Sequence, residues 1–178
     1  MDLFQAIEDR YSYRGAFKPT LVPEVDLRWI VQAGLLAPSG KNLQTTEFVI
    51  ANETEKVARI REVLGNRPYI DTAPAFIATL FAAGQAHPAS DSFFFEVEDN
   101  AAATQNLLLA ITALGYASVW LDGVLRREQR AERIGAILGL PPTKRIRVLL
   151  PVGIPTGSGP RKDKRGFGER AWFNRYGG

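Results

Sequence analysis

Two arginines and a serine near the N-terminus have the types and spacing of an anion-binding group. In the segment Arg10-Tyr11-Ser12-Tyr13-Arg14, a guanidinium stands at each end and a hydroxyl at the centre. Guanidinium groups present forked N–H donors that match phosphate oxygens, and the serine hydroxyl adds a further donor. A solvated basic turn would use the same residues, so this segment alone leaves a phosphate site and a plain surface turn both open.

A second candidate is the loop Ala37-Pro38-Ser39-Gly40-Lys41-Asn42-Leu43-Gln44, which follows an expected helix. Its small residues, amide side chains and free backbone N–H groups suit recognition of a planar polar ring. An ordinary connecting loop has the same composition, because proline, glycine, serine and asparagine all favour turns. The loop becomes informative only together with other parts of the chain.

The remaining polar candidates have plainer interpretations. Asn100, Gln105 and Asn106 lie in an otherwise apolar helical stretch, and we interpret these amides as structural because buried amides commonly bond to backbone groups. His87, the single histidine, lies in an expected loop over residues 84–92, and we interpret it as a solvated residue and not as a catalytic base.

The residue types that are missing exclude several classes of chemistry. The chain has no cysteine and one histidine, which excludes disulfides, thiol nucleophiles, iron–sulfur clusters and multi-histidine metal sites. Neither common glycine-rich phosphate loop occurs, and the glycines of residues 153–159 have no helix behind them. An anionic ligand would therefore be held by side chains.

The net charge argues against a nucleic-acid partner. Lysine and arginine number 22 against 19 acidic residues, a formal +3 that is too small to indicate nucleic-acid binding in bulk. The surplus gathers in residues 161–175, so a basic interaction module remains a minor alternative. No apolar run approaches the ~20 residues of a membrane span. We therefore expect a cytoplasmic protein with neither membrane nor nucleic acid as a partner.

The hydrophobic patterning that must position these candidates predicts one α+β domain over residues 1–178, with a C-terminal arm over about 156–178. Helices are expected at residues 2–9, 23–37, 54–64, 94–114 and 126–138, with Pro23 at the first helical position. Strands are expected at residues 48–51, 75–82, 117–121 and 145–152. The expected architecture is a central mixed sheet flanked by helices around the long core helix 94–114.

The aromatic residues of the arm need a cover. Trp172, Phe173 and Tyr176 lie at the end of the chain with no further element behind them. Left bare, they would expose a large apolar patch. Either the arm crosses onto a partner subunit or it folds back onto its own domain.

Taken together, the segments resemble the FMN-dependent nitroreductase family. Residues 10–14 are similar to its R-x-S-x-[RK] start, and residues 37–44 to its A-P-S-x-x-N-x-Q loop. Residues 101–120 resemble its central-helix signature A-x-x-x-Q-N-L-L-L-A…A-L-G-x-x-S-x-W, and residues 150–155 its closing L-P-x-G-x-P. Thr45-Thr46-Glu47 replaces the frequent Pro-Trp after the glutamine, and only about fifteen residues separate the second expected strand from the long helix. The chain thus resembles a small, minimal member.

The resemblance implies a nitroreductase-like fold and a homodimer with FMN at the subunit interface. The cofactor-binding residues that it implies are Arg10, Tyr11, Ser12, Arg14, Pro38, Ser39, Gly40, Asn42, Asp122, Gly123, Lys164 and Arg165. Among these, the 10–14 segment would hold the phosphate and ribityl chain, and the 38–42 loop of the partner would line the isoalloxazine. Asp122-Gly123 would place a backbone N–H near flavin N5, and Lys164 or Arg165 would reach the phosphate.

The implied function is an FMN-dependent oxidoreductase. Hydride would pass from NADH or NADPH through the flavin to a small-molecule acceptor, such as a nitroaromatic or quinone, in a ping-pong cycle. No catalytic side chain and no metal are required, which suits a chain with one histidine and no cysteine. The alternative is an FMN-binding or flavin-remodelling protein with little NAD(P)H oxidase activity.

Overall fold

The computed structural model describes residues 1–82 and 95–177, so the expected loop 84–92 and His87 lie outside the described residues. In chain order the elements are α1 (Leu3–Asp9), α2 (Glu24–Leu35), the 3₁₀ turn η1 (Gly40–Asn42), β1 (Glu47–Ala51), α3 (Thr54–Leu64), α4 (Pro68–Asp71), β2 (Ala75–Ala82), α5 (Glu96–Ala113), α6 (Arg130–Ile137), β3 (Lys144–Val152) and α7 (Phe167–Arg170). Within the two described ranges, no helix is long and apolar enough to cross a membrane.

The sheet has the strand order β1-β2-β3, and both pairs are antiparallel. Val49 pairs with Ala78 and Ile77 with Leu150, and the β2–β3 register shifts between Thr79 and Leu80. The α+β class is confirmed, but the mixed character expected of the sheet is confined to one isolated parallel bridge between Ser12 and Ser118.

The expected strand 117–121 is wrong as a regular strand. Ala117 and Leu121 form isolated antiparallel bridges with Gly153 and Leu149, while the carbonyl of Ser118 accepts the N–H of Tyr13 at 2.9 Å. The segment divides its hydrogen bonds between β3 and the N-terminal chain. No continuous ladder to either side forms, although the apolar side chains are buried as the pattern predicted.

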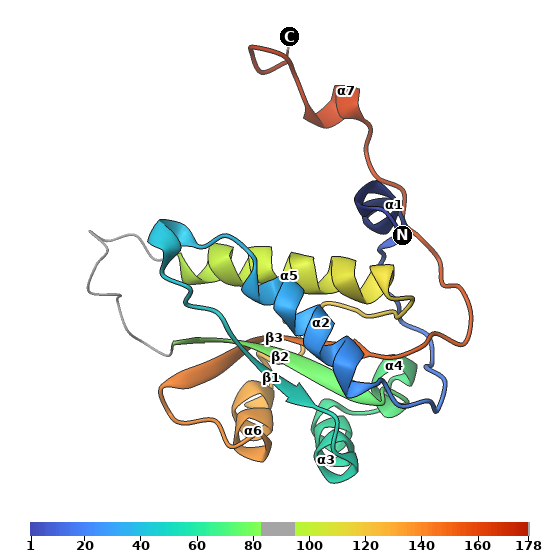
Figure 1. Ribbon diagram of the computed structural model, residues 1–178, viewed down its shortest axis with the longest axis vertical. Helices are drawn as coiled ribbons and strands as arrows, with labels where there is room; N and C mark the ends of the chain where they lie inside the picture. Colours follow the sequence, from blue (N-terminus) through green and yellow to red (C-terminus); the bar gives the residue numbers. More distant parts are fainter. Residues whose placement is uncertain (83–94, 178) are drawn as a thin grey trace.

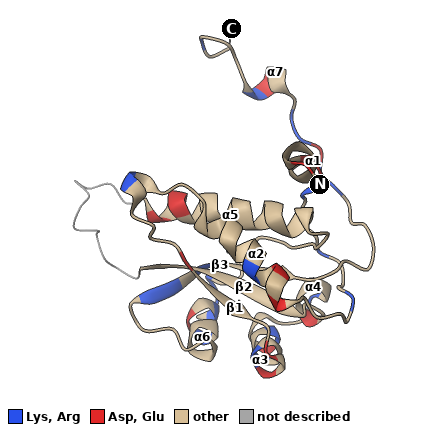
Figure 2. Cartoon of the chain, in the orientation of Figure 1, with Lys and Arg blue, Asp and Glu red and all other residues tan. Residues whose placement is uncertain are grey.

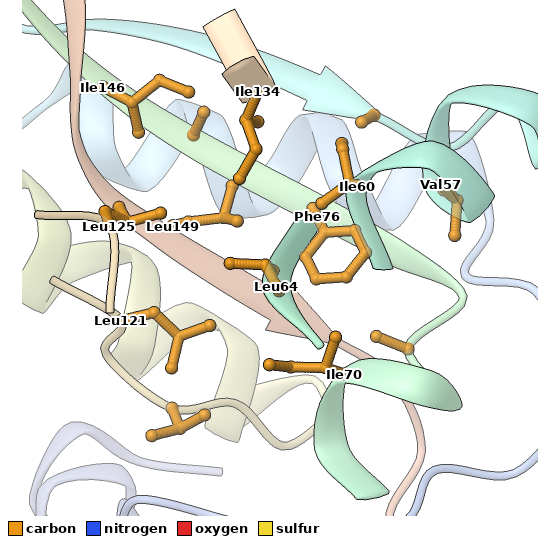
Figure 3. Close-up of a cluster of buried hydrophobic side chains, with 14 of the residues drawn as sticks. Val57, Ile60, Leu64, Ile70, Phe76, Leu121, Leu125, Ile134, Ile146 and Leu149 are labelled. Atoms are coloured by element: carbon orange, nitrogen blue, oxygen red, sulfur yellow. The ribbon is translucent and has the colours of Figure 1, made fainter. Parts of the chain in front are cut away.

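Helices cover the sheet on both faces. Figure 1 shows α2 and α5 on one face and α3 and α6 on the other. Figure 3 shows the core on the second face, where Ile60, Leu64, Phe76, Ile134 and Leu149 pack together and each is at most 1 % exposed. On the first face, Leu107 and Ile111 of α5 pack against β2 and β3. This two-sided burial explains why β2 is almost continuously apolar.

One side of the helical layer stays uncovered in the single chain. Phe4 of α1, Trp29 of α2 and Leu114 after α5 are 76 %, 63 % and 42 % exposed. The long core helix packs against α1, α2 and β2 but keeps part of its surface exposed, although it was expected to be surrounded. The single chain therefore exposes large hydrophobic side chains on α1, on α2 and at the end of α5.

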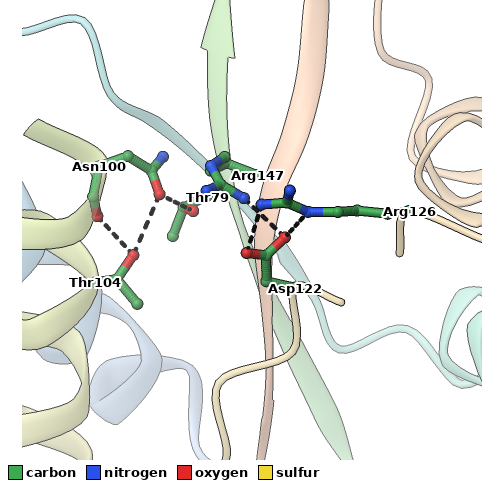
Figure 4. A network of polar contacts seen from close by, with 6 residues as sticks. All are labelled: Thr79, Asn100, Thr104, Asp122, Arg126 and Arg147. Atoms are coloured by element: carbon green, nitrogen blue, oxygen red, sulfur yellow. Dashed lines mark hydrogen bonds and ion pairs between the residues drawn. The ribbon is translucent and has the colours of Figure 1, made fainter. Parts of the chain in front are cut away.

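Two of the three amides of α5, Asn100 and Asn106, are structural as predicted, whereas Gln105 is not. Asn100, 1 % exposed, accepts the Thr79 hydroxyl at 2.8 Å and also lies 3.3 Å from Thr104 Oγ1 (Figure 4). Asn106 donates to the carbonyl of Ala33 in α2 at 3.0 Å. Gln105 points away from the core and is exposed. These bonds fix α5 against both β2 and α2.

Two helix starts differ from expectation. The helix expected from residue 126 begins only at Arg130, because Glu128 and Gln129 have left-handed φ angles of 55° and 52° that break it. Pro23 stands at the N-cap of α2 and not at its first helical position.

The arm leaves the body beyond α1, carrying the short helix α7 that the sequence analysis did not predict (Figure 1).

Candidate functional site

Five of the predicted cofactor-binding residues lie around one cavity of about 430 Å³, here called the basic pocket. Its lining comprises Ile7, Glu8, Arg10, Tyr11, Ser12, Arg14, Pro160, Arg161, Lys162 and Lys164. The residues come from the end of α1, from the segment that follows it and from the start of the arm. Figure 2 shows the segment of the arm that carries basic residues next to α1. Arg165, the other predicted arm residue, is exposed and does not line the pocket.

The extended backbone after α1 explains how the arginines meet. The helix ends at Asp9, and Arg10 takes an extended conformation. Side chains alternate along extended backbone, so Arg10, Ser12 and Arg14 share one side. Tyr13 points the other way and is 2 % exposed, with its hydroxyl donating to the Ala16 carbonyl at 2.6 Å. A buried tyrosine between two basic residues therefore sets the direction of both guanidinium groups.

Tyr11 contacts the arm as well as lining the pocket. Its hydroxyl accepts the N–H of Gly159 at 3.0 Å, and the Arg161 guanidinium lies 5.0 Å from its ring centroid. Arg161 also donates to the carbonyls of Glu8 and Asp9 at 3.1 Å each, which places its charge at the C-terminal end of α1, where a cation is favoured. Sequence reasoning missed this fastening role of Arg161, although its place in the basic stretch was a usable signal.

The chemistry of the basic pocket fits a phosphate group. Glu8 is the one acidic residue in its lining, against three arginines and two lysines. None of the ion pairs formed among the described residues includes Arg10, Arg14, Lys162 or Lys164. Cations gathered without acidic partners repel one another, and a dianionic phosphate relieves that repulsion while accepting several charge-assisted hydrogen bonds.

The predicted ring-binding loop lies elsewhere. Pro38 and Ser39 line a separate cavity of about 510 Å³ with α2, β1 and the start of α5, and Gly40 and Asn42 belong to η1. Figure 1 shows η1 and α1 near opposite ends of α5. An 18-residue helix is about 27 Å long. Within one chain, the loop and the basic pocket are not brought together.

Asp122 and Gly123 form a third location. The Asp122 carboxylate accepts two bonds from Arg126, at 2.7 and 2.8 Å, and pairs with Arg147 at 2.7 Å (Figure 4). Partial burial on its own would raise the pKa of Asp122, but the hydrogen bonds from Arg126 and Arg147 hold it below its usual value. Gly123 is exposed, and none of the described residues lies within 4 Å of the place a Cβ would take. There is thus open space beside Gly123, while the neighbouring carboxylate is engaged.

Comparison with known proteins gives one consistent result. The model of the Nitroreductase family matches residues 7–68 and 60–154. A protein of Archaeoglobus fulgidus, provisionally named NADH dehydrogenase/NAD(P)H nitroreductase, is 31 % identical over 170 residues, which cover 94 % of this chain and 90 % of the relative.

Solved structures agree with the fold. A Bacteroides thetaiotaomicron protein with the same provisional name has a TM-score of 0.81 at 24 % identity, and each chain covers 98 % of the other. A Desulfovibrio desulfuricans protein, provisionally a nitroreductase and solved in complex with FMN, has a TM-score of 0.76 at 25 % identity. That match covers 95 % of this chain and 94 % of the other.

Proposed function

Because the chain belongs to the nitroreductase family, as the match over residues 7–68 and 60–154 shows, we propose that it is an FMN-dependent oxidoreductase that uses NADH or NADPH. The acceptor is a small molecule such as a nitroaromatic or a quinone. The relative from A. fulgidus carries the corresponding name, and the D. desulfuricans structure holds FMN. As predicted from the sequence, we propose the cytoplasm as its compartment.

The single observation that carries the proposal is the basic pocket. Arg10, Ser12, Arg14 and Lys164 converge there, and in the described part of the chain none of these three cations has an acidic partner. Their side chains replace the glycine-rich phosphate loop that the sequence lacks. We assign these residues to the FMN phosphate and ribityl chain. Tyr11 lines the same pocket and fastens the arm, and Arg165 is one position too far along the arm to line it.

We further propose a homodimer in which each FMN lies between two chains. Pro38, Ser39, Gly40 and Asn42 of one chain would line the ring of the flavin whose phosphate is held by the other. Two features support this arrangement: the loop and the basic pocket lie near opposite ends of α5, and α1, α2 and the end of α5 expose large hydrophobic side chains. Asp122 and Gly123 would offer backbone N–H groups at the flavin edge.

When bound, FMN supplies the redox chemistry, taking hydride from NAD(P)H and passing it to the acceptor in a ping-pong cycle. The protein's own residues bind and orient. Among the described residues, no group of three or more His, Cys, Asp or Glu could hold a metal ion. Asp122 is held ionised by two arginines, so it is a poor proton donor near neutral pH. The site thus depends on positioning and charge.

The test is anaerobic mixing of the FMN-loaded protein with NADH or NADPH in a stopped-flow spectrometer. Bleaching of the flavin absorption, followed by recovery on adding a quinone or nitroaromatic, is the expected result. A protein that binds FMN tightly but leaves it oxidised would instead be an FMN-binding or flavin-remodelling protein. A purified protein that neither contains nor binds FMN would refute both functions.

A further inference from the structure

A buried carboxylate ties the start of α5 to the loop over residues 38–45. Asp99, in the first turn of α5, is 5 % exposed. One of its oxygens accepts the backbone N–H of Gly40 at 2.8 Å, and the other accepts the hydroxyl of Thr45 at 3.0 Å. The two donors stand near opposite ends of the loop. A single side chain therefore holds both of its sides.

The loop between these two anchors has a backbone that needs such support. Lys41, Asn42 and Gln44 have φ angles of 50°, 56° and 52°, in the left-handed region that non-glycine residues disfavour. A Cβ at Gly40 would overlap the ring of Phe95, so this position accepts only glycine without a rearrangement. Inside the loop, Ser39 Oγ accepts the N–H of Gln44 at 3.0 Å. External contacts must offset the unfavourable backbone angles.

A carboxylate suits this task better than a neutral acceptor. Hydrogen bonds to an ionised oxygen are stronger than those to a neutral oxygen. Burial strengthens them further, since the local dielectric is lower than that of water. The positive end of the α5 dipole stabilises the charge at this position. Asp99 thus provides a strong and rigid anchor where Pro38 and Ser39 also face the adjoining cavity.

We propose that Asp99 is a positioning residue for flavin binding: it fixes loop 38–45 in the shape that receives the ring of the FMN held by the partner's basic pocket. This inference rests on the function proposed above. Asp99 lines the same cavity as Pro38 and Ser39, and it acts on the loop through its hydrogen bonds to Gly40 and Thr45. Losing the anchor should release the left-handed segment and weaken flavin binding through the changed shape of the loop.

The chain offers a matched pair of variants for the test. Thr45→Val removes a hydroxyl bonded to Asp99, whereas Thr46→Val removes a buried hydroxyl that has no hydrogen-bond partner among the residues that the structure describes. Asp99→Ala removes both anchors, and Asp99→Asn keeps an oxygen for the N–H of Gly40. Thr45→Val also keeps Asp99 in place, so it remains informative if Asp99→Ala fails to fold.

Two measurements are made on each full-length variant. Hydrogen exchange of the Gly40 amide in the FMN-free protein reports the anchor directly. FMN affinity from fluorescence quenching, with visible circular dichroism of the bound flavin, reports the ring environment. Asp99→Ala should accelerate Gly40 exchange and raise the Kd for FMN roughly 10- to 100-fold with an altered dichroism spectrum. Thr45→Val should show a smaller change in the same direction, Asp99→Asn should recover Gly40 protection, and Thr46→Val should match the parent protein.

The outcomes separate the two proposals. If Gly40 exchange is unchanged in Asp99→Ala and Thr45→Val, or if exchange accelerates while FMN affinity and dichroism stay constant, the role of Asp99 is refuted. If the parent protein itself binds no FMN, the proposed function fails, and the assignment of Asp99 to flavin binding fails with it. Gly40 exchange then still tells whether Asp99 fixes the loop.

Discussion

Replacing Arg10 by alanine should weaken FMN binding without unfolding the protein. Arg10 follows α1, is partly buried and lines the basic pocket, where no acidic side chain of residues 1–82 and 95–177 forms an ion pair with it. A charge-assisted hydrogen bond to a partly buried phosphate contributes about 1.5–3 kcal/mol, which corresponds to roughly 10- to 150-fold in Kd. Arg14 is exposed, so solvent screening puts Arg14→Ala near the lower end of that range.

The assay is titration of FMN-free protein followed by quenching of flavin fluorescence at low and moderate salt. Arg127→Ala is the matched control, because Arg127 is exposed and lies outside the basic pocket. The affinity of the parent protein should fall with added salt, and more steeply than that of Arg10→Ala, which has one cation fewer at the phosphate. Thermal unfolding of the FMN-free proteins confirms that each variant is folded. Unchanged FMN affinity in both Arg10→Ala and Arg14→Ala would refute the assignment of the FMN phosphate to the basic pocket.

Three other outcomes follow from the structure. Arg161→Ala should free the arm from the end of α1, so that proteolysis beyond Pro160 becomes faster and the Kd for FMN rises about 3- to 10-fold. Equal cleavage rates in the variant and the parent protein would contradict the role of Arg161 in holding the arm. Truncation after Pro160 should weaken both the dimer and FMN binding, because it removes Lys164 and the aromatic residues of the arm. Sedimentation at matched dilution, with and without FMN, tests this. A truncated chain that still forms the dimer and binds FMN would show that the arm contributes to neither. Asp122→Asn should lower stability at neutral pH by no more than about 1 kcal/mol, since the pair is partly exposed. The folded pKa of Asp122 lies below its ordinary 3.8, so its contribution is present above that pH and is lost as pH falls through the folded pKa. The free energy of unfolding, measured with urea as a function of pH, should therefore fall less at acid pH in Asp122→Asn than in the parent protein. Parallel curves of unfolding free energy against pH for the two proteins would contradict this role of Asp122.

The local hydrophobic pattern of the sequence was sufficient to predict the bounds of an element where that element buries one continuous stretch of side chains. The helix 54–64 and the strand 75–82 have the predicted bounds, because one face of the helix and both faces of the strand pack into the core. The same reasoning was wrong for the segment 117–121, because its bridge partners, among them Ser12 and Leu149, lie far away in the sequence. An apolar run indicates burial but not which neighbours complete its hydrogen bonds.

The candidate site shows the same division. The spacing of Arg10, Ser12 and Arg14 can be read from the sequence, whereas the approach of Lys164 to them was implied only by the resemblance to the family. The contact of Asp99 with Gly40 joins residues 59 positions apart, and no local signal reveals it. The choice between Lys164 and Arg165 likewise depends on where Arg161 fastens the arm, which is a tertiary contact.

The separation of loop 38–45 and the basic pocket near opposite ends of α5 has a genetic consequence. In a two-fold dimer each ligand would draw on two different copies of the chain. A copy carrying only Arg10→Ala and a copy carrying only Gly40→Ala would each form defective homodimers. In a mixed dimer, both substitutions lie in the same one of the two binding sites. The other site is formed by an unaltered basic pocket and an unaltered loop. Two inactive alleles expressed together would complement each other, whereas two lesions in the same pocket would not.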